Sequence, residues 1–192
     1  MSRVYSGYAY VDNYENIGGT VTDFENAQAD DGNYENIYEN TDNVFDVYHY
    51  ITEVPRDHSY EIQIEYYIVG TTEEVKLYLW DFDAGQWVYI ENLPYSGTDT
   101  VYTLTLTDDN YNFRALVNDN QAENVHLRFR QADSTVGRTS LMIDYVRIFH
   151  STTMGADHPM VVALDRGDFW AKEGYWTFPG ITHYLSIEEA AY

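Results

Sequence analysis

Hydrophobic and polar residues alternate along much of the chain, the pattern of a β-strand with one buried face and one wet face. The clearest case is 60–68, Tyr-Glu-Ile-Gln-Ile-Glu-Tyr-Tyr-Ile, in which the even-numbered side chains form one apolar face. The same alternation marks 75–79 and 125–129, and it marks 101–106 less regularly. We expect each of these segments to be a strand.

The segment 141–149 is also expected to be a strand, but its apolar phase shifts midway. A β-bulge, or burial on both faces, would account for that shift. The segment 80–90 predicts a hairpin whose turn is Asp-Ala-Gly at 83–85. Three weaker segments complete the series: 4–11, 34–39 and 44–51. Strands at this spacing, without a convincing amphipathic helix, predict an all-β fold, a two-sheet antiparallel β-sandwich of jelly-roll-like type.

The pattern changes after residue 150. The segment 151–192 loses the alternation but keeps many aromatic residues, whereas disordered tails are poor in them. We therefore expect a β-sandwich domain at 1–150 and an extended C-terminal arm at 151–192 that packs on its own domain or on a neighbouring subunit. The residues expected to form that interface are Phe169, Trp170, Tyr175, Trp176, Phe178 and Tyr184.

Composition supports the β assignment and limits the partners. Aromatic residues make up 17% of the chain, with 20 Tyr, and Tyr and Thr suit a half-buried pleated surface. The formal net charge is −22, from 32 acidic and 10 basic residues. Such a chain repels the phosphates of nucleic acids and anionic lipids, so neither is an expected partner. Solubility, a basic protein partner and calcium binding all remain as explanations of the acidity.

Cysteine is absent, which excludes disulfides, thiolate catalysis and Cys-based zinc sites. The first residues carry no basic segment followed by an apolar one, and no run is long enough to cross a bilayer. If Met1 is native, we expect synthesis in a cytoplasm without export by the usual signal.

Carboxylates in turns suggest one metal site. Asp81 and Asp83 enter a turn at positions i and i+2, and Asp30 and Asp31 are adjacent before a glycine. Ca²⁺ takes six to eight oxygen ligands, so either loop would need further carboxylates. Asp144 is a further candidate ligand, since it lies among apolar residues. The simpler explanation for the turns is that Asp accepts hydrogen bonds from its own backbone.

Asp144 has two further explanations. A buried carboxylate is costly unless it is paired, and Arg128, Arg130 or Arg147 could pair with it. Alternatively, Asp144 lies on the wet face of its strand.

No catalytic motif is present: the chain has no phosphate-binding glycine loop, no His-Glu-x-x-His and no Gly-x-Ser-x-Gly. We therefore expect no enzyme activity. Aromatic residues on or near strand faces could stack on sugar rings or anchor a protein interface. We expect Trp80 and Trp87 in the core and leave the tyrosines open between core and surface. The residues concerned are Tyr48, Tyr50, Tyr67, Tyr78, Trp80 and Trp87.

Four segments carry a family resemblance. They are the Gly-Thr to Asp-Gly-Asn-Tyr stretch at 19–34, the Trp-bearing hairpin at 77–87, and the closing strands at 125–130 and 141–146. Residues 19–149 resemble β-sandwich domains of phage structural proteins and prokaryotic surface proteins. The resemblance implies a sandwich and a virion or surface context, without catalytic residues to carry over.

The leading expectation is a non-enzymatic virion structural protein, a capsid decoration or accessory subunit that assembles through its arm as a homo-oligomer or on a shell. One alternative is a lectin-like carbohydrate-binding module on an extracellular surface, with structural calcium and a glycan as partner. A second alternative is a self-assembling extracellular filament subunit whose arm completes the sheet of the next subunit.

Overall fold

The structure is a computed structural model. It describes residues 3–40, 44–54, 59–70, 74–107, 116, 123–131, 139–154, 176–178 and 181–188.

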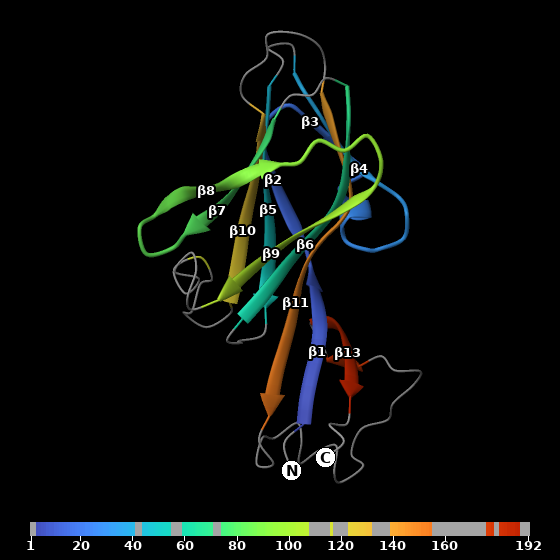
Figure 1. Ribbon diagram of the computed structural model, residues 1–192, viewed down its shortest axis with the longest axis vertical. Coiled ribbons are helices and arrows are strands. Elements are labelled where there is room, and N and C mark those ends of the chain that lie inside the picture. The colour runs from blue at the N-terminus through green and yellow to red at the C-terminus, as the bar shows by residue number, and fades with distance from the viewer. Residues whose placement is uncertain are drawn as a thin grey trace.

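The described strands form two antiparallel sheets that pack face to face (Figure 1), which confirms the predicted all-β sandwich. The first sheet has five strands in the order β2-β5-β10-β7-β8. Its strands are β2 (Asn13–Gly18), β5 (Phe45–Val54), β10 (Glu123–Gln131), β7 (Val75–Asp81) and β8 (Gln86–Leu93). β7 and β8 form the predicted hairpin.

The second sheet has eight strands and is organised around the long strand β11. One edge of β11 pairs with β6, which pairs in turn with β9. The other edge pairs first with β4 and then with β1. The strands are β1 (Arg3–Tyr10), β3 (Thr20–Thr22), β4 (Glu35–Tyr38), β6 (Ser59–Val69), β9 (Thr100–Thr107), β11 (Ser140–Met154), β12 (Trp176–Phe178) and β13 (Ile181–Glu188).

The phase shift in β11 is a bulge, one of the two explanations that the sequence left open. The register between β11 and β6 shifts between Ile143 and Tyr145, which leaves Asp144 as the extra residue. This is also the point at which the other edge of β11 changes partner, from β4 to β1. Ile143 and Val146 belong to the core cluster, whereas Asp144 and Tyr145 do not, although both are buried.

Two strands of the C-terminal segment were not predicted. β13 pairs with β1 over Val4 to Tyr8, and β12 pairs with β13. In Figure 1, β11, β1 and β13 project below the rest of the sandwich, where both chain ends lie. Of the predicted interface residues, Trp176 and Phe178 lie in β12 and Tyr184 lies in β13. The other three, Phe169, Trp170 and Tyr175, lie outside the described residues.

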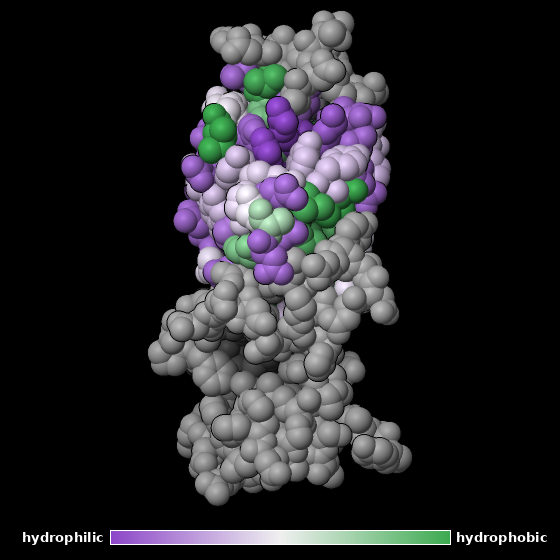
Figure 2. Space-filling view, turned by 90° about the vertical axis from the view of Figure 1, so that its left-hand side faces the viewer, coloured by the Kyte–Doolittle hydropathy of each residue, from purple (hydrophilic) through white to green (hydrophobic). Residues whose placement is uncertain are grey.

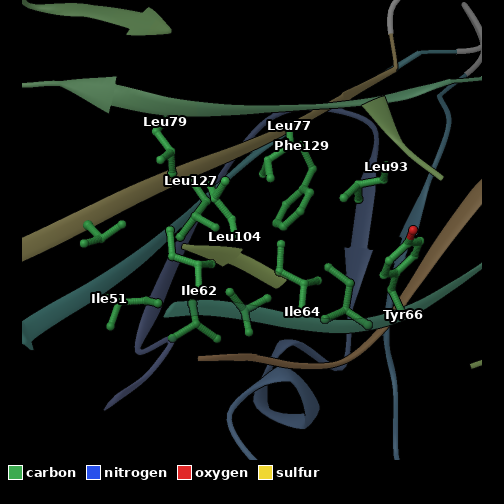
Figure 3. Close-up of a cluster of buried hydrophobic side chains, with 14 of the residues drawn as sticks. Ile51, Ile62, Ile64, Tyr66, Leu77, Leu79, Leu93, Leu104, Leu127 and Phe129 are labelled. Carbon is green, nitrogen blue, oxygen red and sulfur yellow. The ribbon is translucent and has the colours of Figure 1, made fainter. Parts of the chain in front are cut away.

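The core lies between the two sheets. Figure 3 shows side chains of both layers pointing toward one another, among them Leu77 and Phe129 from one sheet and Ile62 and Ile64 from the other. All four are fully buried. At roughly 1.5–3 kcal/mol for each large apolar side chain buried, this layer supplies the main stabilisation of the fold. A short 3-10 helix, η1 (Phe24–Ala27), packs against β11 and β4.

One polar pair is enclosed in this core. The His49 Nε2 atom lies 3.1 Å from the Glu35 Oε1 atom, and both residues are fully buried. The pair joins β5 of one sheet to β4 of the other. The remaining polar atoms, Glu35 Oε2 and His49 Nδ1, make no hydrogen bond. Because burial of a half-satisfied pair is costly, we expect this pair to fix how the sheets align rather than to add net stability.

A double-mutant cycle tests that expectation. His49→Leu alone should lower the free energy of unfolding by about 3–5 kcal/mol, because it leaves the Glu35 carboxylate buried without a partner. The double variant Glu35→Leu/His49→Leu should lie within about 1 kcal/mol of wild type, or above it. Urea denaturation of wild type, both single variants (Glu35→Leu and His49→Leu) and the double variant measures the four free energies of the cycle. A double variant that is as unstable as the sum of both single variants would contradict the expectation.

Candidate functional site

The outer face of the five-stranded sheet is the strongest candidate site. In β5, β7 and β10 the side chains alternate between fully buried and half-buried, so each core residue leaves its neighbours on the outer face. We call this surface the aromatic face. It comprises Asp46, Tyr48, Tyr50, Lys76, Tyr78, Trp80, Trp87, Tyr89, His126, Arg128 and Arg130.

Strand register arranges these side chains in rows. The central row crosses all five strands: Glu15 is opposite Tyr48, Tyr48 opposite Arg128, Arg128 opposite Tyr78, and Tyr78 opposite Tyr89. Directly opposed residues have Cβ atoms about 4.5–5.5 Å apart, so the row is continuous. Tyr89 is its most exposed aromatic member, with 49% of its surface exposed.

Arg128 lies at the centre of the aromatic face. Its Nε and Nη2 atoms donate to the two carboxylate oxygens of Asp46, at 2.7 and 2.5 Å. Its guanidinium also lies 5.5, 5.3 and 5.7 Å from the ring centroids of Tyr48, Tyr78 and Trp87. Hydrogen bonding to Asp46 raises the pKa of Arg128, although burial opposes the shift. The two-pronged contact and the surrounding rings fix the guanidinium in one orientation.

The hairpin turn positions two tryptophans on this face. Asp81 Oδ1 accepts hydrogen bonds from the N–H groups of Asp83 and Ala84, each at 2.9 Å. The turn closes at Gly85, which has a φ of 64° and donates its N–H to the Asp81 carbonyl. Trp80 and Trp87 are therefore opposed, with ring centroids 5.3 Å apart.

The prediction that Trp80 and Trp87 lie in the core is wrong. Both are half-buried and sit outside the core cluster, because the inner face of the hairpin is taken by Leu79 and Val88. Tyr48, Tyr50 and Tyr78 likewise lie on the outer face. Tyr67 is half-buried on the other sheet, where its ring meets Tyr34 edge-on at 5.0 Å.

The far end of the aromatic face is also ordered by side-chain contacts. Tyr50 meets the His126 ring edge-on at 4.6 Å and donates its hydroxyl to Glu15 at 2.8 Å. Phe82 contacts the same imidazole at 4.9 Å. Burial lowers the pKa of His126, and Asp12 partly offsets that effect. His126 is therefore favoured in its neutral form, as one more flat ring of the surface.

The aromatic face combines flat rings with charged groups held in place. Figure 2, which views the molecule from the β7–β8 side of Figure 1, shows pale side chains of intermediate hydropathy mixed with hydrophilic ones. Hydrophobic groups on this side are confined to small areas of the surface. Such a mixture suits a ligand that has both apolar faces and many hydroxyl groups.

A second cluster lies on the eight-stranded sheet, at the bulge of β11. Ligand atoms of Asp30, Glu65 and Asp144 lie within 4.8 Å of one another. Asp144 Oδ1 accepts N–H hydrogen bonds from Asp31 at 3.4 Å and Gly32 at 3.0 Å. Asp144 is only 4% exposed, so the expectation that it lies on the wet face is wrong. Its carboxylate is bound by these backbone N–H groups and not by one of the arginines that the sequence suggested as partners.

An arginine adjoins this acidic cluster. Arg147 donates to Asp30 Oδ2 at 3.0 Å, to Gln63 at 2.9 Å and to the Tyr10 hydroxyl at 3.1 Å. It also lies 3.9 Å from the ring centroid of Tyr145. Arg147 thus supplies positive charge to one member of the cluster.

The predicted calcium ligands separate into two groups. Asp30 and Asp144 come together with Glu65, which the sequence did not single out because it lies far from both along the chain. Asp31 contributes its backbone N–H, and its carboxylate accepts from the N–H of Asn33. Asp81 holds the hairpin turn, and Asp83 is an exposed member of that turn. Calcium at Asp30 and Asp144 stays a prediction.

Comparisons with known proteins identify no family for this chain. No family model and no curated protein matches the sequence.

Solved structures match this chain at low sequence identity. A family 29 carbohydrate-binding module variant complexed with mannohexaose is 15% identical, covers 78% of this chain and 92% of that chain, and gives a TM-score of 0.46. A variant complexed with cellulohexaose is 13% identical, with coverage of 77% and 92% and a TM-score of 0.46. A third such module is 14% identical, with coverage of 77% and 89% and a TM-score of 0.46. At these values the similarity assigns no function to this chain.

The described part of the chain contains no helix that is both long and apolar enough to pass through a membrane.

Protonation of the acidic cluster should affect stability. Burial raises the pKa of the Asp144 carboxyl. Burial is also the larger cause of the raised pKa of Glu65, and the negative charge of Asp144 raises that pKa further. A raised pKa means that the fold favours the protonated form. The stability linked to these groups is therefore fully present below the ordinary carboxyl pKa, and it is lost as the pH rises through the raised pKa.

We accordingly expect Asp144→Asn to gain stability relative to wild type as the pH rises from about 4 to about 7, because the amide keeps an acceptor for Asp31 and Gly32 without the charge. Urea denaturation at both pH values measures the difference, and a gain that is equal at both would contradict the charge argument.

The same experiment with CaCl₂ tests calcium binding. Bound calcium should raise the urea midpoint of wild type and leave the midpoint of Asp144→Asn unchanged.

Proposed function

We propose that this chain is a non-catalytic carbohydrate-binding module whose glycan lies across the aromatic face. The observation that carries the proposal is the central row, in which Arg128 is held by Asp46 and flanked by the rings of Tyr48, Tyr78 and Trp87. Sugar rings present an apolar face that stacks on aromatic rings and an edge of hydroxyl groups that needs fixed donors and acceptors. The aromatic face supplies both within one row.

The site is built before any ligand arrives. The guanidinium of Arg128 is already oriented by two hydrogen bonds, and Tyr50 is fixed by its bond to Glu15. Binding therefore loses little side-chain entropy, which is the usual cost of ordering an interface. This matters for glycans, because each hydrogen bond to a hydroxyl replaces one to water and its net gain is small.

The ring orientations favour a single glycan chain over a crystalline surface. Interplanar angles are 73° for Trp80 and Trp87, 47° for Tyr48 and Trp87, and 67° for Tyr78 and Tyr89. Rings at such angles cannot all contact one flat sheet of sugar. A twisted single chain can present successive rings at different angles.

The virion hypothesis has less support from the described residues. It rested on the aromatic arm, and Phe169, Trp170 and Tyr175 lie outside them. The described part of the arm pairs through β13 with β1 of the same chain. None of the similar structures named above is a virion protein. The arm's role in assembly, as a homo-oligomer or on a shell, stays a prediction.

Tyr89→Ala should weaken glycan binding by about tenfold, which corresponds to ~1.4 kcal/mol, because it removes the most exposed ring of the central row. Tyr89→Phe should keep most of the affinity, since it keeps the ring. A glycan array identifies the ligand, and titration calorimetry then measures the affinities.

Tyr95→Ala is the matched control, because Tyr95 is 48% exposed but lies outside the aromatic face. It should bind as wild type does. If Tyr95→Ala loses affinity and Tyr89→Ala keeps it, the glycan binds elsewhere. If wild type binds nothing on a broad array of plant, microbial and animal glycans, the proposed function is wrong.

A further inference from the structure

The cations of the aromatic face point to the class of glycan. We propose that the ligand is an acidic glycan, and that Lys76 and Arg130 together bind the carboxylate of a uronic acid residue. This inference rests on the carbohydrate-binding function proposed above.

Positive charge is concentrated on this face. The structure describes the side chains of four basic residues, namely Lys76, Arg128, Arg130 and Arg147, and the first three lie on the aromatic face. The fourth, Arg147, is on the other sheet and is bound by Asp30. In a chain with 32 acidic and 10 basic residues, such a grouping runs against the overall charge.

The arrangement of two of these cations is unfavourable for the fold. Arg130 is directly opposite Lys76 in the register between β10 and β7. Like charges directly opposite on neighbouring strands destabilise a sheet. An acidic residue at either position would remove the repulsion, and acidic residues are the commoner kind in this sequence. Residues that destabilise their own strand pairing in this way are expected at functional sites.

The two cations are only partly neutralised. Arg130 shares Asp46 with Arg128, which takes both carboxylate oxygens by hydrogen bonds, so Arg130 keeps only a 3.8 Å contact between its Nε atom and Asp46 Oδ2. The Arg130 side chain is 42% exposed. Within the described part of the chain, Lys76 is half-buried and makes no hydrogen bond and no ion pair, and the exposed Glu74 two residues earlier binds neither cation. Three cations of the aromatic face therefore have one carboxylate between them.

Their position suits a substituent of a stacked sugar. Lys76 and Arg130 are each two residues along their strands from Tyr78 and Arg128, which places the two rows about 6.8 Å apart. A sugar ring stacked on the exposed ring of Tyr89, which is opposite Tyr78, can therefore direct a ring substituent toward the cations. A planar carboxylate matches the fork of a guanidinium, and the ammonium of Lys76 adds a second donor on its other side.

The test compares acidic and neutral forms of the same sugars. Short oligomers of galacturonate, glucuronate and mannuronate are each titrated beside their methyl esters, which remove the charge and keep the ring. With wild type, we expect one acid form to bind at least about tenfold more tightly than its ester. Added NaCl should weaken the binding of the acid form, since the cations are exposed.

Two variants complete the design. Lys76→Gln/Arg130→Gln should lower the affinity for the acid form to about that of the ester. Arg166→Gln/Lys172→Gln also removes two positive charges, at positions outside the described residues, and it should keep the wild-type preference. That control separates an effect of this site from an effect of net charge.

The outcomes distinguish the two proposals. If acid and ester bind equally, or if wild type prefers neutral sugars, the acidic-glycan inference is overturned and the carbohydrate-binding function stands. Binding restricted to sulfated sugars would overturn the assignment of a carboxylate. If wild type binds no acidic, neutral or sulfated sugar, both proposals are wrong.

Discussion

The two-residue period of the β-strand is the constraint on which this molecule depends. Because successive side chains point to opposite faces, burial of Val47, His49 and Ile51 between the sheets commits Tyr48 and Tyr50 to the outer face. The same holds for β7 and β10. The same alternation therefore determines both the residues of the core and those of the candidate site. A register slip of one residue would expose the core and bury the charged row together, so selection for the fold also fixes the site.

Hydrogen bonds and ring contacts then convert this pattern into a defined surface. An arginine among aromatic rings could adopt many rotamers, but the two hydrogen bonds that Arg128 donates to Asp46 leave it with one. On the opposite sheet Arg147 is held in a similar way, by Asp30, Gln63 and Tyr10. The two arginines differ in their surroundings. Arg147 lies beside a loop that covers the bulge, whereas the aromatic face also carries Lys76, Arg130 and an exposed tyrosine.

The sequence predicted the strands that alternate and failed where tertiary contacts decide. The fold class and the hairpin follow from local pattern alone, and both were confirmed. The pattern also located the irregularity in β11 but left a bulge and burial on both faces open, and the register shows the bulge. The position of Trp80 and Trp87 was missed because bulk and hydrophobicity favoured the core, although their phase relative to Leu79 already indicated the outer face. The sequence could not predict that Glu65 lies close to Asp144, because the two residues are on different strands and meet at the bulge of β11. The strand β13 lacks a clear alternation, and its pairing with β1 depends on an edge that only the folded sheet offers.

A net charge of −22 repels an acidic ligand at long range, but screening by salt limits that repulsion to short distances. At physiological ionic strength, charges more than about 8 Å apart are largely screened from one another. A carboxylate at the aromatic face therefore responds mainly to Lys76 and Arg130, while the acidic remainder acts on distant parts of a long chain. Attraction at the site combined with repulsion beyond it disfavours a long, dense polyanion. It favours a short acidic oligomer, or a glycan in which acidic residues are spaced among neutral ones.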